Sequence, residues 1–142
     1  MDKVKTLAAI NKAMKNTLME TLAITYIDYA EDFSYMVATM PVTPRVHQPM
    51  GLLHGGATIA LAESVGSAAS HFAAGEKFEA RGIEISANHV RSIREGMVTA
   101  TARIIHRGRS THLWEIRIVD EQDRLISICK LTNMIIPKRK IN

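Results

Sequence analysis

Residues 55–74 read GGATIALAESVGSAASHFAA, and this stretch decides the fold class. Most of its residues are Gly, Ala, Ser or Thr, and Glu63 is its one formally charged residue. Small side chains let a helix approach its neighbours closely, so the composition predicts a buried helix packed against a sheet. Gly75-Glu76-Lys77 is typical of a helix end, so the predicted helix covers the whole stretch.

Strand-like patterns lie on both sides of this helix. Apolar and polar side chains alternate in six segments: 22–30, 33–41, 81–92, 97–106, 110–120 and 124–136. Short turn-like joins such as Arg107-Gly108-Arg109 favour antiparallel neighbours. Residues 3–18 instead place apolar side chains on one helical face. We therefore predict one α+β domain over 1–142, with a short N-terminal helix at 3–18 and an antiparallel sheet of about six strands around one long central helix.

The composition excludes several classes of protein. The chain has 142 residues, of which 46% are hydrophobic and 23% charged, as in an ordinary globular domain. No apolar run approaches the ~20 residues that span a bilayer, and the N-terminus lacks the apolar core of a signal peptide. We therefore expect a cytoplasmic protein with no membrane partner. Cys129 is the single cysteine, so no disulfide forms within one chain.

The net charge of +4 fits a nucleic acid, but equally a smaller polyanion such as a nucleotide or coenzyme A. The basic residues recur in small separate groups and lack interleaved aromatic residues. Nucleic-acid binding is therefore the weakest interpretation, and we expect no nucleic-acid partner.

The start of the central helix has the chemistry of an anion site. The N–H groups of Gly55 and Gly56 lack intrahelical partners and lie at the positive end of the helix dipole. Because glycine has no β-carbon, a ligand oxygen can approach closely, as the oxyanion of an attacked carbonyl would. Gln48 and His54 precede the helix and are candidates to orient such a carbonyl. A Gly-Gly pair before a helix is, however, often only a turn.

Glu63 lies two turns further along the same helix, among small apolar neighbours. A carboxylate in such surroundings is costly unless it is solvated, hydrogen-bonded or paired. Ser67 follows four residues later, so its hydroxyl shares the face of Glu63 and can hold the carboxylate or a water. A lone helix Glu usually faces solvent, so these residues alone leave a functional role for Glu63 open.

Other catalytic machinery is missing from the sequence. The six histidines form no H-x-x-x-H or H-E-x-x-H pair that would hold zinc, so we expect no metal. No phosphate-binding loop, dinucleotide fingerprint or G-x-S-x-G nucleophile motif is present either.

Three runs carry a resemblance to a known family. They are QPMGLLHGGA at 48–57, LAESVGS at 61–67 and GIEISANHVRSIREG at 82–96. Together they resemble the hot-dog-fold acyl-CoA thioesterases of the 4-hydroxybenzoyl-CoA thioesterase superfamily. The likeness is to the branch of 1,4-dihydroxy-2-naphthoyl-CoA hydrolases and enterobactin proofreading thioesterases, and it spans nearly the whole chain.

The resemblance implies a fold, an assembly and a set of roles. It implies a central helix wrapped in a sheet, and homodimers with active sites at the interface, usually paired into homotetramers. Glu63 becomes the general base or nucleophile, Gly55 N–H and His54 polarise the thioester carbonyl, Gln48 assists and Ser67 positions water. Coenzyme A is implied to contact a larger set: Gly82, His89, Arg91, Ser92, Arg107, Gly108, Arg109 and Ser110. No separate cofactor is implied, because coenzyme A is part of the substrate.

The expected activity is hydrolysis of an aromatic or medium-sized acyl-CoA, such as 1,4-dihydroxy-2-naphthoyl-CoA, to the free acid and coenzyme A. Whether Glu63 activates water or attacks the carbonyl itself stays open at this point. Two alternatives on the same fold also remain: an acyl-CoA-binding protein without catalysis, and a dehydratase of 3-hydroxyacyl substrates.

Overall fold

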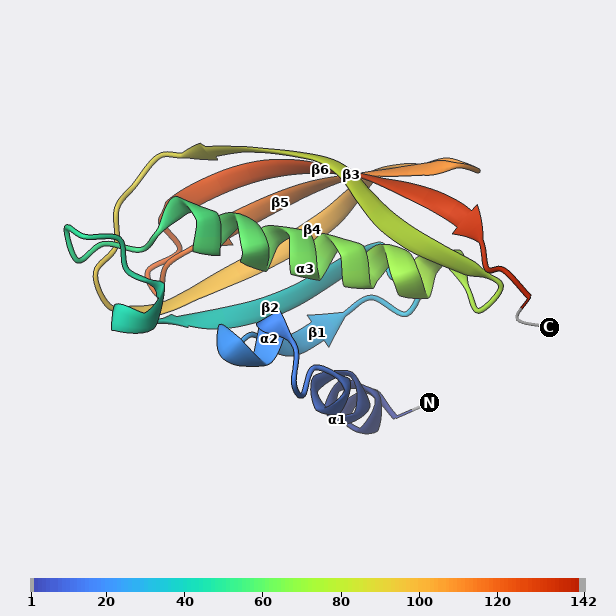
Figure 1. Ribbon diagram of the computed structural model, residues 1–142, viewed down its shortest axis with the longest axis horizontal. Helices are drawn as coiled ribbons and strands as arrows, with labels where there is room; N and C mark the ends of the chain where they lie inside the picture. Colours follow the sequence, from blue (N-terminus) through green and yellow to red (C-terminus); the bar gives the residue numbers. More distant parts are fainter. Residues whose placement is uncertain (1, 141–142) are drawn as a thin grey trace.

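The computed structural model describes residues 2–140 (Figure 1). The helices are α1 (Lys3–Ala13), α2 (Leu18–Thr21) and α3 (Gly55–Ala74), and a short 3-10 turn covers Pro44–Val46. The strands are β1 (Thr25–Tyr29), β2 (Tyr35–Val42), β3 (Phe78–His89), β4 (Gly96–Arg107), β5 (Thr111–Val119) and β6 (Leu125–Pro137). The predicted helix over 55–74 is confirmed at both ends, and the six predicted strands are present with ends displaced by one to three residues.

The six strands form one antiparallel sheet in the order β1-β2-β4-β5-β6-β3. The sheet curves around α3, which crosses its concave face, while α1 and α2 lie near the β1 edge (Figure 1). Within the described part of the chain, β3 pairs only with β6, so the outer edge of this long strand is left open there. The predicted α+β class, with a long central helix wrapped by six strands in the hot-dog arrangement, is confirmed.

Small residues on α3 let it lie close to the sheet. Leu61 and Val65 of α3 pack with Trp114, Ile116 and other fully buried side chains of the core. Gly66 is needed for this approach, since a β-carbon there would meet the Leu131 side chain at 2.6 Å. The close packing fixes where each side chain of α3 lies relative to the sheet.

The predicted helix over 3–18 is wrong at residues 14–17, because α1 ends at Ala13 and a separate short helix begins at Leu18. Asn16 between them has a φ of 64°, the left-handed conformation that ends a right-handed helix and that Asn tolerates. After this break, α2 runs in a different direction from α1 before the chain enters β1 (Figure 1).

Asn11 fastens α1 to the edge of the sheet. Its side-chain amide donates to the backbone oxygen of Tyr26 at 2.9 Å and accepts from the Tyr26 N–H at 2.8 Å. The edge strand β1 is thereby partly covered by a helix, which is one way that proteins protect a sheet edge. Of the helices that the structure describes, none is long and apolar enough to span a membrane.

Candidate active site

The loop before α3 is held in place by backbone hydrogen bonds. The His54 N–H donates to the Val46 oxygen and the Leu53 N–H to the Ile93 oxygen, both at 2.8 Å. Gly51 turns the loop with a φ of 74°, and its N–H donates to the Gln48 oxygen at 2.9 Å. These contacts bring Gln48 and His54 to the N-terminal end of α3, as the sequence predicted.

His54 caps the helix. Its Nδ1 accepts the Gly56 N–H at 2.8 Å, so the neutral ring carries its hydrogen on Nε2. The side chain is exposed, and this Nε2–H is therefore free to donate to a ligand. One residue thus stabilises the start of α3 and presents a hydrogen-bond donor beside it.

Gly55 lines a small cavity of about 250 Å³, together with Gln48, His89, Arg91 and Ser92 among others. Within residues 2–140, no acceptor is found for the Gly55 N–H. The ring of His89 lies against this residue, because a β-carbon at Gly55 would be 2.9 Å from His89 Nε2. The cavity therefore combines a bare N–H group with basic and polar side chains, which suits an oxygen that gains negative charge.

Glu63 is half-buried on α3 and faces Gly82 of β3. Its Oε1 occupies the space where a β-carbon of residue 82 would sit. The pairing of β3 with β6 is irregular between Gly82 and Glu84, as at a β-bulge, where the strand approaches Glu63. Among the described residues, Glu63 has no ion-pair partner, so its charge is not neutralised within the chain.

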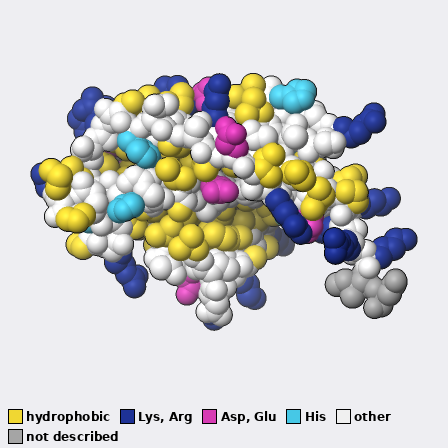
Figure 2. Space-filling model, turned by 45° about the horizontal axis from the view of Figure 1, so that its top comes forward, with side chains coloured by type: hydrophobic (Ala, Val, Ile, Leu, Met, Phe, Trp, Pro, Cys, Tyr) yellow, Lys and Arg dark blue, Asp and Glu magenta, His cyan; other side chains and the backbone are white. Residues whose placement is uncertain are grey.

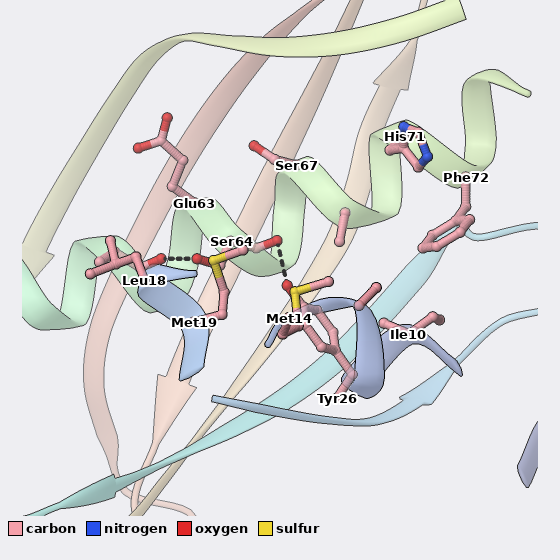
Figure 3. Close-up of a pocket in the computed structure, with 13 residues that line it drawn as sticks. Ile10, Met14, Leu18, Met19, Tyr26, Glu63, Ser64, Ser67, His71 and Phe72 are labelled. Carbon is pink, nitrogen blue, oxygen red and sulfur yellow. Dashed lines mark hydrogen bonds between the residues drawn. The ribbon is translucent and has the colours of Figure 1, made fainter. Parts of the chain in front are cut away.

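Ser67 lies one turn after Glu63, on the face that the sequence predicted (Figure 3). Its Oγ donates to Asn133 Oδ1 at 3.4 Å, and the Asn133 amide in turn donates to Ser70 Oγ at 2.8 Å. Because the hydroxyl hydrogen of Ser67 is used in this way, its lone pairs remain to accept from a water. Sequence reasoning missed Asn133, which is distant in the chain and carries no motif.

A buried hydrogen-bond network behind Asn133 fixes the direction of the hydrogen bond from Ser67 to Asn133. Ser70 Oγ accepts from Trp114 Nε1 at 2.7 Å and from Asn133, so its own hydrogen is left for His112 Nδ1 at 3.0 Å. Burial lowers the pKa of His112, and the charges of Arg107 and His106 act in the same direction. His112 is therefore a neutral acceptor, and each hydrogen bond of the network has one direction.

The residues predicted for coenzyme A are not brought together by one chain. His89, Arg91 and Ser92 lie at the Gly55 end of α3, and Gly82 lies against Glu63. The Arg107–Ser110 turn lies at the other end, where Arg107, Gly108 and Arg109 line a cavity of about 190 Å³ with Ala73 and Ala74. The coenzyme role of both groups stays a prediction.

A larger cavity of about 560 Å³ lies beside Glu63 and was not predicted from the sequence (Figure 3). Its walls come from α1 and α2 on one side and from α3 on the other. The apolar face of the N-terminal segment was visible in the sequence, but nothing in its pattern showed that it would face α3. Within residues 2–140, no three His, Cys, Asp or Glu side chains converge to hold a metal ion.

Comparisons relate the chain to known proteins. The sequence profile of the thioesterase superfamily matches residues 50–127. The proofreading thioesterase of Cronobacter sakazakii is 42% identical over 131 residues, which cover 92% of this chain and 94% of that protein. The 1,4-dihydroxy-2-naphthoyl-CoA hydrolase of Escherichia coli is 41% identical over 131 residues, covering 92% and 95% of the two chains.

A solved structure indicates the same family as these relatives. The crystal structure of a thioesterase from Haemophilus influenzae superimposes with a TM-score of 0.88 at 38% identity, covering 92% of this chain and 90% of that one. The resemblance carried by residues 48–57, 61–67 and 82–96 is therefore confirmed.

Proposed function

Because this chain belongs to the thioesterase superfamily and is a thioester hydrolase, we propose that its substrate is an acyl-CoA and that Glu63 is the catalytic carboxylate. The acyl group is aromatic or medium-sized, and 1,4-dihydroxy-2-naphthoyl-CoA, for which the Escherichia coli relative is named, is the aromatic candidate. The observation that carries the proposal is that, among the described residues, α3 carries a Glu63 carboxylate without an ion-pair partner and a Gly55 N–H without an acceptor, beside the Gly56 N–H that His54 caps. A carbonyl oxygen needs such donors, and its carbon needs a base or nucleophile nearby.

The spacing of these groups supports an active site shared by two chains. Gly55 and Glu63 are eight residues apart, which is about 12 Å along an α-helix. A thioester carbonyl held at hydrogen-bond distance from Gly55 N–H lies beyond the reach of Glu63 in the same chain, because reacting atoms must come within about 3.5 Å. A second copy with its α3 antiparallel supplies the missing partner.

Two-fold symmetry then sets the geometry. In a symmetric dimer, residue 55 of one chain faces residue 63 of the other, and the reverse holds at the second site. Ile59 is the midpoint of this pair, so the two-fold axis passes between the two α3 helices close to Ile59. The open outer edge of β3 supports the same arrangement, since Ile83 on this strand and Val90, which directly follows it, are 54% and 58% exposed. Two such edges can pair and join the sheets.

In the proposed reaction, the carbonyl oxygen accepts from Gly55 N–H of one chain and from His54 Nε2–H. Glu63 of the other chain takes a proton from water, or attacks the carbonyl carbon and is released by water. Ser67 accepts from the same water, because its own hydrogen is donated to Asn133. The bond between the carbonyl carbon and sulfur breaks, and the leaving thiolate takes the proton that water gave up, so the products are the free acid and coenzyme A.

A panel of acyl-CoA esters, read with a thiol dye, tests the activity. The single thiol of the enzyme interferes little, because Cys129 is buried and burial raises the pKa of its thiol. We expect Glu63→Ala and Glu63→Gln to lower kcat by about 10²–10⁴-fold without loss of fold. Full activity in folded Glu63→Ala protein would exclude Glu63 as the catalytic group, and binding without turnover by the natural chain would indicate a binding protein.

Mixing two inactive variants tests the shared site. Glu63→Ala keeps an intact Gly55, and Gly55→Val keeps an intact Glu63. Random exchange makes half of the dimers mixed, and each mixed dimer has one complete site, so about a quarter of the natural activity returns. If each chain carried its own complete site, the mixture would stay inactive.

A further inference from the structure

The cavity of about 560 Å³ between the N-terminal segment and α3 has the size of a small-molecule site (Figure 3). One wall consists of Ile10, Ala13, Met14, Leu18 and Met19 from α1, α2 and the turn between them. The opposite wall comes from α3. Figure 2 looks onto this side of the molecule and shows hydrophobic side chains gathered across the middle of the face.

The cavity is continuous with the proposed active site. Glu63 and Ser67 both line it, together with Ala60, Ser64 and Ala68 of the same helix. A molecule that lies in the cavity with its reactive group toward Glu63 therefore extends along α3 toward Phe72.

Two hydroxyl groups of the cavity, those of Tyr26 and Ser64, are already used by the fold, whereas Glu63, Ser67 and His71 keep polar atoms along the α3 wall. The Tyr26 hydroxyl donates to the Ser64 backbone oxygen at 3.0 Å, and the Ser64 hydroxyl donates to the Ala60 oxygen at 2.6 Å (Figure 3). The α1–α2 wall offers no hydrogen-bonding group beyond the weak acceptor sulfurs of Met14 and Met19. A hydroxylated ring would leave polar groups unpaired against this wall, which is costly, whereas flexible Met side chains adapt well to an alkyl chain.

The far end is closed by a stack of aromatic rings. Phe72 stacks on Phe33 with ring centroids 5.1 Å apart, and Phe33 stacks on Tyr29 at 5.0 Å. Phe33 has a φ of 56°, a left-handed conformation that is unfavourable for an aromatic residue. Such a conformation persists only where the surroundings hold it, so the stack is a firm end wall.

From these features we propose that the cavity is the acyl pocket, and that the α1–α2 wall and Phe72 select a flexible, unhydroxylated acyl chain of medium length. This inference rests on the proposed acyl-CoA hydrolysis. Glu63 and Phe72 are nine residues apart, or about 13 Å along the helix. An extended chain with bonds of about 1.5 Å advances about 1.3 Å per carbon, so about ten carbons fill the cavity.

The test is the rate profile of the full-length enzyme on straight-chain acyl-CoAs from butyryl to palmitoyl, with 1,4-dihydroxy-2-naphthoyl-CoA alongside. We expect kcat/KM to rise by up to about fourfold per added methylene to an optimum near decanoyl, and then to fall. We also expect decanoyl-CoA to exceed the dihydroxynaphthoyl ester.

Two substitutions move the optimum in opposite directions. Phe72→Ala opens the end wall and shifts the optimum to longer chains, while Ala68→Leu fills the cavity and lowers kcat/KM for decanoyl-CoA by about tenfold or more. Butyryl-CoA is too short to reach either residue, so its kcat/KM stays near the natural value in both. Met134→Ala is the control, since Met134 is an exposed residue of β6 that does not line the cavity.

Several results would overturn the inference. One is a preference for the dihydroxynaphthoyl ester, together with a flat chain-length profile that neither substitution changes. If Glu63→Ala still abolishes turnover in that case, the proposed hydrolysis stands and only the inference about the pocket fails. Another is a change of oligomeric state with an unchanged profile, which would mean that a second copy of the chain fills the cavity. A natural enzyme that cleaves no ester of the panel would overturn the proposed function and this inference together.

Discussion

Gly82 of β3 lies directly against the carboxylate of Glu63 on α3, with Oε1 in the space that a β-carbon would occupy. This contact joins the open edge strand to the proposed catalytic acid. It also gives Gly82 a reason to be glycine that is independent of coenzyme A, because any larger residue pushes the carboxylate away.

Gly82→Ala should therefore displace Glu63 while leaving the fold intact. We expect kcat to fall by about 100-fold, the cost of misplacing a catalytic group by about 1 Å, with little change in KM. Steady-state kinetics with one acyl-CoA measures both constants, and circular dichroism checks the fold. Glu63→Asp withdraws the carboxylate from Gly82. This substitution should lower kcat by a smaller factor in the Gly82→Ala background than in the natural chain. Additive losses would show that the two residues do not act through their contact.

His54 combines two roles that substitution can separate. Asn is a good helix cap and keeps an acceptor for the Gly56 N–H, so His54→Asn should retain stability, whereas His54→Ala should lose about 1 kcal/mol. Both variants remove the Nε2–H donor, and we expect kcat to fall by about 10²–10³-fold in each. Urea unfolding and kinetics on the two variants make the comparison. Normal turnover in His54→Asn would leave His54 with the capping role alone.

The parts of the molecule that follow from local sequence were predictable. The bounds of α3 were predictable because small residues fill the helix and Gly75, which has a φ of 85°, ends it. The grouping of Gln48, His54 and Gly55 was too, because these residues are neighbours in the chain. A glycine in a strand often marks the close approach of another group, so the sequence indicated such an approach at Gly82. That the approaching group is Glu63 follows only from how β3 passes α3 in the folded chain.

Other features depend on packing between distant segments and were not predictable. The break at Asn16 sets the direction of α2, and only the folded chain shows that α1 and α2 then face α3. The left-handed conformation of Phe33 is explained by its stack with Phe72, which lies 39 residues away in the sequence. The Arg107–Ser110 turn resembles a coenzyme-binding segment, yet it lies at the opposite end of α3 from His89.

The buried Ser70 hydroxyl should matter more for stability than its size suggests. Ser70→Ala removes the partner of Trp114 Nε1, Asn133 Nδ2 and His112 Nδ1 at once. Each unsatisfied buried group costs about 1–3 kcal/mol, and we expect a total loss of about 2–4 kcal/mol, since the groups partly rearrange. Urea unfolding at neutral pH measures the loss.

Ser64→Ala is the matched control for Ser70→Ala. It makes the same chemical change on the same helix, but Ser64 donates only to the Ala60 oxygen of the preceding turn, so it should cost less than about 1 kcal/mol. Ser70→Ala should also lower kcat, because Asn133 no longer holds Ser67 in one orientation. Equal stability of the two variants would show that the network around Ser70 contributes little.

Tyr26 gives the fold a defined alkaline limit. Burial raises the pKa of the Tyr26 hydroxyl to about 12, above its ordinary value of 10.0. Between these values the folded chain keeps the proton that the unfolded chain has lost, so folding stability is intact below pH 10 and declines as the pH rises toward 12. The difference in pKa corresponds to a loss of roughly 3 kcal/mol.

Tyr26→Phe separates the loss of folding stability that Tyr26 causes from the effects of other groups that titrate at alkaline pH. At pH 8 the variant should be less stable by about 1 kcal/mol, since it lacks the hydrogen bond to the Ser64 oxygen. Near pH 12 the order should reverse, because the variant has no phenol to ionise on unfolding. Urea midpoints of both proteins at several pH values measure the crossing. Parallel curves with no crossing would mean that the hydroxyl ionises equally in the folded and unfolded chains.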